Sequence, residues 1–117
     1  MTRVVLFDDV LSLRGEEFRI PGLQVTVYPN ADDAAVICTA KDARPEVVCM
    51  DFAMGPEHLP GDEAVRALRR AGFSGRVVAM SSDPKANQRM LDAGADESLD
   101  KKAMLRSFLV ALGKERA

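Results

Sequence analysis

Short apolar runs that alternate with longer amphipathic stretches constrain the fold of this chain most. Val4–Phe7 is an uninterrupted apolar run, as expected for a central strand that is buried on both faces of a parallel sheet. Runs at Gln24–Tyr28, Glu46–Met50 and Arg76–Met80 predict three more strands, and Glu97–Leu99 predicts a weak fifth. Strands that alternate with helical patterns predict an α/β fold built around a parallel sheet.

The stretches between these runs carry helix signals. Asp83-Pro84 predicts the start of a helix that ends at Gly94, because aspartate caps helices and proline suits the first helical position. Helices are also expected over residues 31–40, with Asn30 as the cap, and over residues 61–71. These helices would cross from each strand to the next parallel strand.

The first and last helices differ in the strength of their signals. The first crossover, residues 10–18, is expected to form only a short helix because Gly15 lies inside it. The last helix has a clear apolar stripe, which we interpret as a packing face. Its members are Met104, Leu105, Phe108, Leu109 and Leu112.

Length and composition indicate one globular domain spanning residues 1–117. Hydrophobic residues make up 47% of the chain and the formal net charge is −2, which argues against a nucleic-acid partner. The N-terminus resembles neither a signal peptide nor a membrane span, so a cytoplasmic protein is expected. Cys38 and Cys49 lie in apolar runs and are expected to be buried and reduced.

Polar side chains follow four of the five predicted strands, at the point where each strand ends. They are Asp8 and Asp9 after the first strand, Asp51 after the third, Ser81 and Ser82 after the fourth, and Lys101 and Lys102 after the fifth. The carboxyl ends of parallel strands meet at one edge of a sheet, where ligands bind. We therefore expect the carboxylates, the hydroxyl and the ammonium group to converge on one crevice.

Clustered carboxylates need a counter-charge. Two unit charges about 4 Å apart repel by about 4 kcal/mol at an effective dielectric of about 20. An oxygen-only site of this kind suits Mg²⁺, which would lower the barrier for an anionic nucleophile that attacks a phosphodonor. Asp51 is the candidate nucleophile, and Lys101 and Ser81 are candidates to bind phosphoryl oxygens. Lys102 is expected to be a solvated charge.

In these residues the chain resembles the receiver domains of two-component response regulators. The acidic pair of that family corresponds to Asp8-Asp9, its phosphoacceptor to Asp51, its hydroxyl residue to Ser81 and its lysine to Lys101. The stretch Gly94–Lys101 is similar to the family's approach to that lysine.

The resemblance implies a doubly wound, flavodoxin-like sheet of five parallel strands in the order 2-1-3-4-5. It also implies phosphorylation of Asp51 by a histidine kinase or phosphotransfer protein, with Mg²⁺ as the cofactor. The implied metal ligands are Asp9, Asp51 and the backbone carbonyl of Ala53, with Asp8 acting through water. A stand-alone receiver would catalyse only its own phosphorylation and dephosphorylation, and would signal by protein contact or onward phosphotransfer.

The chain departs from the family pattern at several points. Lys102 stands where proline is usual, and Ser98 stands where an aromatic residue usually rotates on activation. The loop Gly55–Gly61 is longer than usual, and its His58 is expected to face water. We therefore expect activation not to rotate an aromatic side chain. It would instead move the start of the fourth helix with the Ser81 hydroxyl or, as we favour, change this loop.

Two other functions remain open at this stage. A phosphatase of the haloacid dehalogenase type also uses an aspartate nucleophile and Mg²⁺, but it needs a second aspartate where this chain has Ala53. A receiver-like binding module that takes no phosphate is the other alternative. Incubation with acetyl phosphate and Mg²⁺ would distinguish the three.

Overall fold

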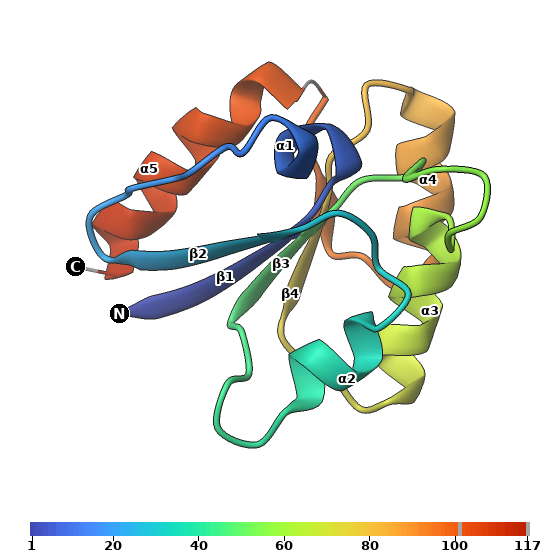
Figure 1. Ribbon diagram of the computed structural model, residues 1–117, viewed down its shortest axis with the longest axis horizontal. Coiled ribbons are helices and arrows are strands. Elements are labelled where there is room, and N and C mark those ends of the chain that lie inside the picture. Colours follow the sequence, from blue (N-terminus) through green and yellow to red (C-terminus); the bar gives the residue numbers. More distant parts are fainter. Residues whose placement is uncertain (101, 117) are drawn as a thin grey trace.

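Five parallel strands form one sheet in the order β2-β1-β3-β4-β5 (Figure 1) in the computed structural model, which describes residues 1–100 and 102–116. The strands are β1 (Thr2–Phe7), β2 (Leu23–Tyr28), β3 (Val47–Met50), β4 (Arg76–Ala79) and β5 (Glu97–Ser98). The helices are α1 (Asp9–Leu13), α2 (Ala34–Thr39), α3 (Gly61–Arg70), α4 (Pro84–Ala93), the short 3-10 helix η1 (Lys102–Met104) and α5 (Leu105–Arg116). The predicted doubly wound α/β fold and its strand order are confirmed.

The central strands bury side chains on both faces of the sheet. In β1, Val5 and Phe7 belong to one core cluster, whereas Val4 and Leu6 belong to the other. This alternation follows from the two-residue repeat of a strand. Helices α2, α3 and α4 cover the first cluster, and α1 and α5 cover the second (Figure 1). Continuous apolar runs are required because both faces of the sheet are covered.

The two cysteines contribute to opposite clusters. Cys38 and Cys49 are both buried and free. Burial raises the pKa of each thiol to about 12, which keeps both thiols protonated at neutral pH. The prediction that they are buried is confirmed, and neither forms a disulfide.

The first helix is short, as the sequence predicted, and the second is shorter than predicted. Helix α1 ends at Leu13, and Gly15 follows with a φ of 65°, a conformation that suits glycine and ends a helix. Helix α2 begins at Ala34, and Asn30 does not cap it. The Asn30 carboxamide oxygen instead accepts the backbone N–H of Asp32 at 3.1 Å, which forms a local turn.

The last helix packs by a narrower stripe than expected. Leu105, Leu109 and Leu112 are buried against the sheet, but Met104 lies in η1 and is exposed. The 3-10 turn changes the rotation of the residues before α5, so Met104 leaves the apolar face. No described helix is both long enough and apolar enough to cross a membrane.

Candidate functional site

The ends of β1 and β3 bring two aspartates together. Phe7 and Met50 are paired in the parallel register, and the backbone N–H of Asp51 donates to the Phe7 carbonyl at 3.0 Å. Asp8 and Asp51 therefore leave neighbouring central strands side by side. Their placement follows directly from the lengths of the two apolar runs that precede them.

The two carboxylate oxygens of Asp8 have different partners. Its Oδ1 caps α1 by accepting the backbone N–H of Leu11 at 3.0 Å. Its Oδ2 is buried, and its partner is the ammonium group of Lys102 at 3.0 Å; the residue as a whole is fully buried. A buried carboxylate oxygen in this state requires a cation nearby, since burial of an uncompensated charge is costly.

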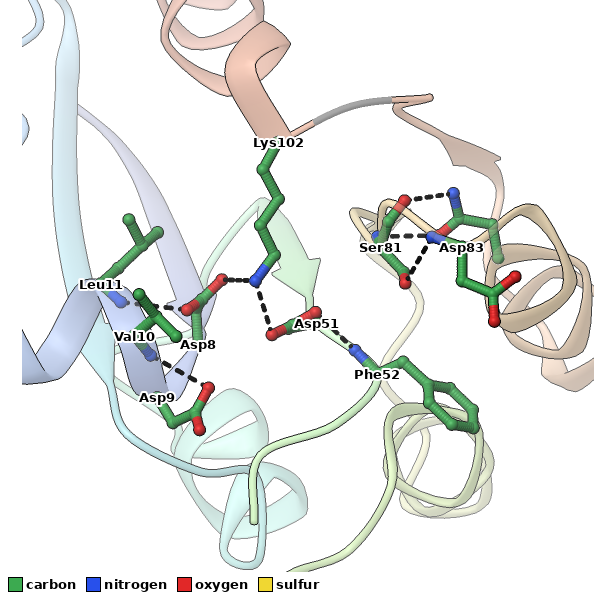
Figure 2. A network of polar contacts seen from close by, with 10 residues as sticks. Asp8, Asp9, Val10, Leu11, Asp51, Phe52, Ser81, Asp83 and Lys102 are labelled. Carbon is green, nitrogen blue, oxygen red and sulfur yellow. Dashed lines mark hydrogen bonds and ion pairs between the residues drawn. The ribbon is translucent and has the colours of Figure 1, made fainter.

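The ammonium group of Lys102 reaches this acidic pair from the start of η1 (Figure 2). Its Nζ lies 2.8 Å from Asp51 Oδ2 and 3.0 Å from Asp8 Oδ2. Burial raises the pKa of the Asp51 carboxyl, and the hydrogen bond from Lys102 offsets part of that rise. Burial alone would lower the pKa of Lys102, but attraction to the two carboxylates outweighs it and raises this pKa.

The acidic cluster fits a hard divalent cation. One oxygen from each of Asp8, Asp9 and Asp51 lies within 4.8 Å of the other two. Asp9 is half-buried, and its Oδ1 accepts the Val10 backbone N–H at 3.0 Å. Carboxylate ligands without histidine or cysteine suit Mg²⁺, and the ammonium group of Lys102 already supplies one positive charge to Asp8 and Asp51.

The end of β4 contributes Ser81 to the same cleft. Its hydroxyl oxygen accepts the backbone N–H of Asp83 at 3.1 Å, which leaves the hydroxyl proton available to donate. Asp83 caps α4 through a bond from the Lys85 N–H, as the sequence predicted. The cleft has a volume of about 340 Å³. It is lined by Asp9, Val10, Asp51, Phe52, Ala53, Ser81, Ser82, Asp83, Ala86 and Lys102.

No protein-family model matches the sequence, and no curated protein matches it either. Solved structures do match. A response regulator of the LuxR family from an Aurantimonas species is 23% identical, with a TM-score of 0.70, and the match covers 99% of this chain and 88% of that one. The receiver domain of a Francisella response regulator is 20% identical, with a TM-score of 0.72, and both chains are fully covered.

A third match is the response regulator TrrA from Thermotoga maritima, which was solved in complex with Mg²⁺–BeF. It is 18% identical, with a TM-score of 0.74, and the match covers 97% of this chain and 98% of that one. Together with the strand order, these similarities decide the fold. The chain has the response-regulator receiver fold.

Most of the predicted site residues of this receiver fold meet in one place. Asp9, Asp51, Ala53 and Ser81 line the cleft, and Asp8 adjoins them. The predicted lysine, Lys101, lies outside the described residues. The expectation that Lys102 is merely a solvated charge is wrong, because its ammonium group pairs with two of the aspartates.

Sequence reasoning also missed the environment of His58. Its Nδ1 lies 2.6 Å from Asp32 Oδ2, and Asp32 Oδ1 accepts the Leu59 backbone N–H at 2.9 Å. This aspartate therefore ties the long loop after β3 to the turn before α2. The expectation that His58 contacts only water is wrong, and no local pattern in the sequence links residues so far apart in the chain.

Proposed function

We propose that this receiver fold is a phosphorylation switch in which Asp51 accepts a phosphoryl group in a Mg²⁺-dependent reaction. The supporting observation is the surroundings of the Asp51 carboxylate. It borders an open cleft, belongs to a cluster of three acids, and lies 2.8 Å from an ammonium group. A nucleophilic carboxylate, a place for a hard cation and a fixed positive charge are the requirements of phosphoryl transfer.

In the proposed reaction an oxygen of Asp51 attacks the phosphorus of a phosphohistidine or of a small acyl phosphate. The new bond is O–P, the broken bond joins phosphorus to the leaving nitrogen or oxygen, and the leaving group keeps the electron pair. Mg²⁺, held by Asp9, Asp51 and the Ala53 carbonyl with Asp8 acting through water, would neutralise charge on the phosphoryl oxygens.

The described residues beside Asp51 have distinct roles in this proposal. The ammonium group of Lys102 would leave the Asp51 carboxylate, with which it pairs in this structure, and would pair with one phosphoryl oxygen. The hydroxyl of Ser81 would donate a hydrogen bond to another. Both groups stabilise charge without taking part in bond making, as is usual for phosphoryl transfer.

The phosphodonor would be a histidine kinase or a phosphotransfer protein, and the signal would leave by protein contact or by onward transfer of the phosphoryl group. A phosphatase of the haloacid dehalogenase type is less well supported. Such an enzyme needs an acid to protonate the leaving group, and the corresponding position in the cleft is Ala53.

Intact-mass spectrometry after incubation with acetyl phosphate and Mg²⁺ tests this function. We expect a single, transient phosphoryl adduct on the wild type and none on Asp51→Asn. Labelling of Asp51→Asn at the wild-type rate would contradict the assignment of the nucleophile. Sustained turnover of many phosphomonoesters would indicate a phosphatase, and a wild type that never labels would indicate a binding module.

A further inference from the structure

Asn87 is a buried polar residue of α4 that the sequence analysis did not single out. It is 5% exposed, whereas its neighbour Gln88 faces solvent. Asparagine is a weaker helix former than alanine, and a buried carboxamide loses its bonds to water. The position of Asn87 therefore requires hydrogen bonds that compensate for both costs.

The side chain of Asn87 makes three hydrogen bonds, and they join two different strand ends. Its Oδ1 accepts the backbone N–H of Ser81 at 2.9 Å, and its Nδ2 donates to the Ser81 carbonyl at 2.8 Å. The same Nδ2 donates to the Leu99 carbonyl at 3.2 Å. Both protons of the amide nitrogen are therefore used, and they require an amide at this position, since a carboxylate has no proton to donate.

The strand pairing around this point explains why such a tie matters. Strands β4 and β5 are paired over two positions only, the last being Ala79 with Ser98, and the Leu99 N–H then donates to the Ala79 carbonyl at 2.8 Å. Beyond it, Asn87 links the backbone of Ser81 to that of Leu99, three residues before Lys102. Ser98 offers no aromatic ring that could pack between them.

We propose that Asn87 is a positioning residue for the phosphoryl-transfer site. It does not line the cleft, and it acts through the two backbone segments that place the Ser81 hydroxyl and the Lys102 ammonium group around Asp51. The inference rests on the proposed function and deepens it. Without the carboxamide, the hydroxyl and the ammonium group lose their fixed mutual geometry, although the acidic cluster stays intact.

Asn87→Ala and Gln88→Ala form a matched pair for the test, because each truncates an amide side chain in the same turn of α4. The measurement is the rate of adduct formation from acetyl phosphate as a function of Mg²⁺ concentration. For Asn87→Ala we expect a maximal rate about tenfold to a hundredfold lower. The Mg²⁺ concentration for half-maximal rate should stay unchanged, since the three aspartates are untouched. Gln88→Ala should label within about twofold of the wild type.

If Asn87 only stabilised the fold, Asn87→Ala would not lower the maximal rate while leaving the Mg²⁺ concentration for half-maximal rate unchanged. Equal maximal rates for Asn87→Ala and the wild type would overturn the positioning role but not the proposed function. A loss of maximal rate in Gln88→Ala as large as that in Asn87→Ala would do the same. A wild type that never labels would instead contradict the proposed function. Asn87→Asp keeps the acceptor for the Ser81 N–H and removes both donors, so it should also label slowly.

If neither Asn87 variant folds, the proposal can be tested on the wild type by NMR measurement of side-chain hydrogen exchange. The two carboxamide protons of Asn87 should exchange with water at least about tenfold more slowly than those of Gln88. The hydrogen bonds of Asn87 are buried, whereas the Gln88 carboxamide, which donates to Asp92 at 2.9 Å, is exposed. Equal exchange rates for the two side chains would show that the tie does not persist in solution and would overturn the proposal.

Discussion

The ammonium nitrogen of Lys102 lies 2.8 Å from Oδ2 of Asp51, between the carboxylates of Asp8 and Asp51 (Figure 2). Lys102 follows the predicted lysine, Lys101, by one residue and stands where the receiver family usually has proline. It is the first residue of η1. Its long side chain reaches the acidic cluster from this point.

Replacement of Lys102 tests which lysine neutralises the site. Lys102→Gln should lower the free energy of unfolding by about 1–3 kcal/mol without added metal, because the buried Asp8 Oδ2 loses its cation. Lys101→Gln is the matched charge change and should have a smaller effect. Urea unfolding in the presence of a chelator measures both. A larger loss in Lys101→Gln would assign the role to Lys101, as the sequence predicted.

Removal of Asp9 tests the metal site. Mg²⁺ at about 100 times its dissociation constant should raise the free energy of unfolding of the wild type by about 2.7 kcal/mol, since it binds only the folded state. Asp9→Ala removes a half-buried carboxylate of the cluster, so its melting temperature should respond far less. Asp92→Ala, which removes an exposed carboxylate of α4, is the control. Equal responses in Asp9→Ala and the wild type would place the cation elsewhere.

Gly61 is required by its close approach to the site. A Cβ at this position would lie 2.3 Å from the Asp51 carbonyl oxygen and 2.9 Å from the Phe52 Cα. Backbone atoms cannot yield as a flexible side chain can, so Gly61→Ala should destabilise the protein by about 1–3 kcal/mol and slow labelling of Asp51. Glu63→Ala, an exposed change in the same helix, should stay within about 0.5 kcal/mol. If Gly61→Ala is as stable as the wild type, the start of α3 can move away from the backbone of Asp51 and Phe52 at no cost.

The tie between Asp32 and His58 predicts an acid-sensitive loop. The hydrogen bond with His58, followed by that from the Leu59 N–H, holds the pKa of Asp32 below its usual value of 3.8. A lowered folded-state pKa stabilises the fold above the usual pKa, and this contribution disappears as the pH falls through the folded-state value. The protection factors of the backbone amides in residues 55–61, which take account of the slower intrinsic exchange in acid, should therefore fall below about pH 4.

Asp32→Asn provides the control for this pH dependence. It keeps an oxygen for the Leu59 N–H but removes the titrating carboxylate. Its loop should exchange faster than that of the wild type at neutral pH, and the difference should vanish in acid. A constant difference across the range would show that Asp32 does not stabilise the loop through its charge.

The sequence alone determined the strands and the edge at which chemistry is possible. Continuous apolar runs such as Val4–Phe7 suit only strands covered on both faces, and the residue that follows each run must emerge at the carboxyl edge of the sheet. For this reason the order of residues along the chain was enough to assign Asp8, Asp51 and Ser81 to one site. Helix lengths were less certain, because capping residues such as Asn30 also form local turns.

Only the tertiary structure decided which side chains meet across elements. Lys102, at the start of η1, contacts Asp51, and no periodicity in the sequence distinguishes it from the lysine before it. Asn87 has the sequence pattern of an ordinary helical residue until its partners Ser81 and Leu99, which follow β4 and β5, are known. Local patterns encode which face of an element is apolar. Hydrogen bonds between distant segments depend instead on backbone positions that exist only once the elements have packed.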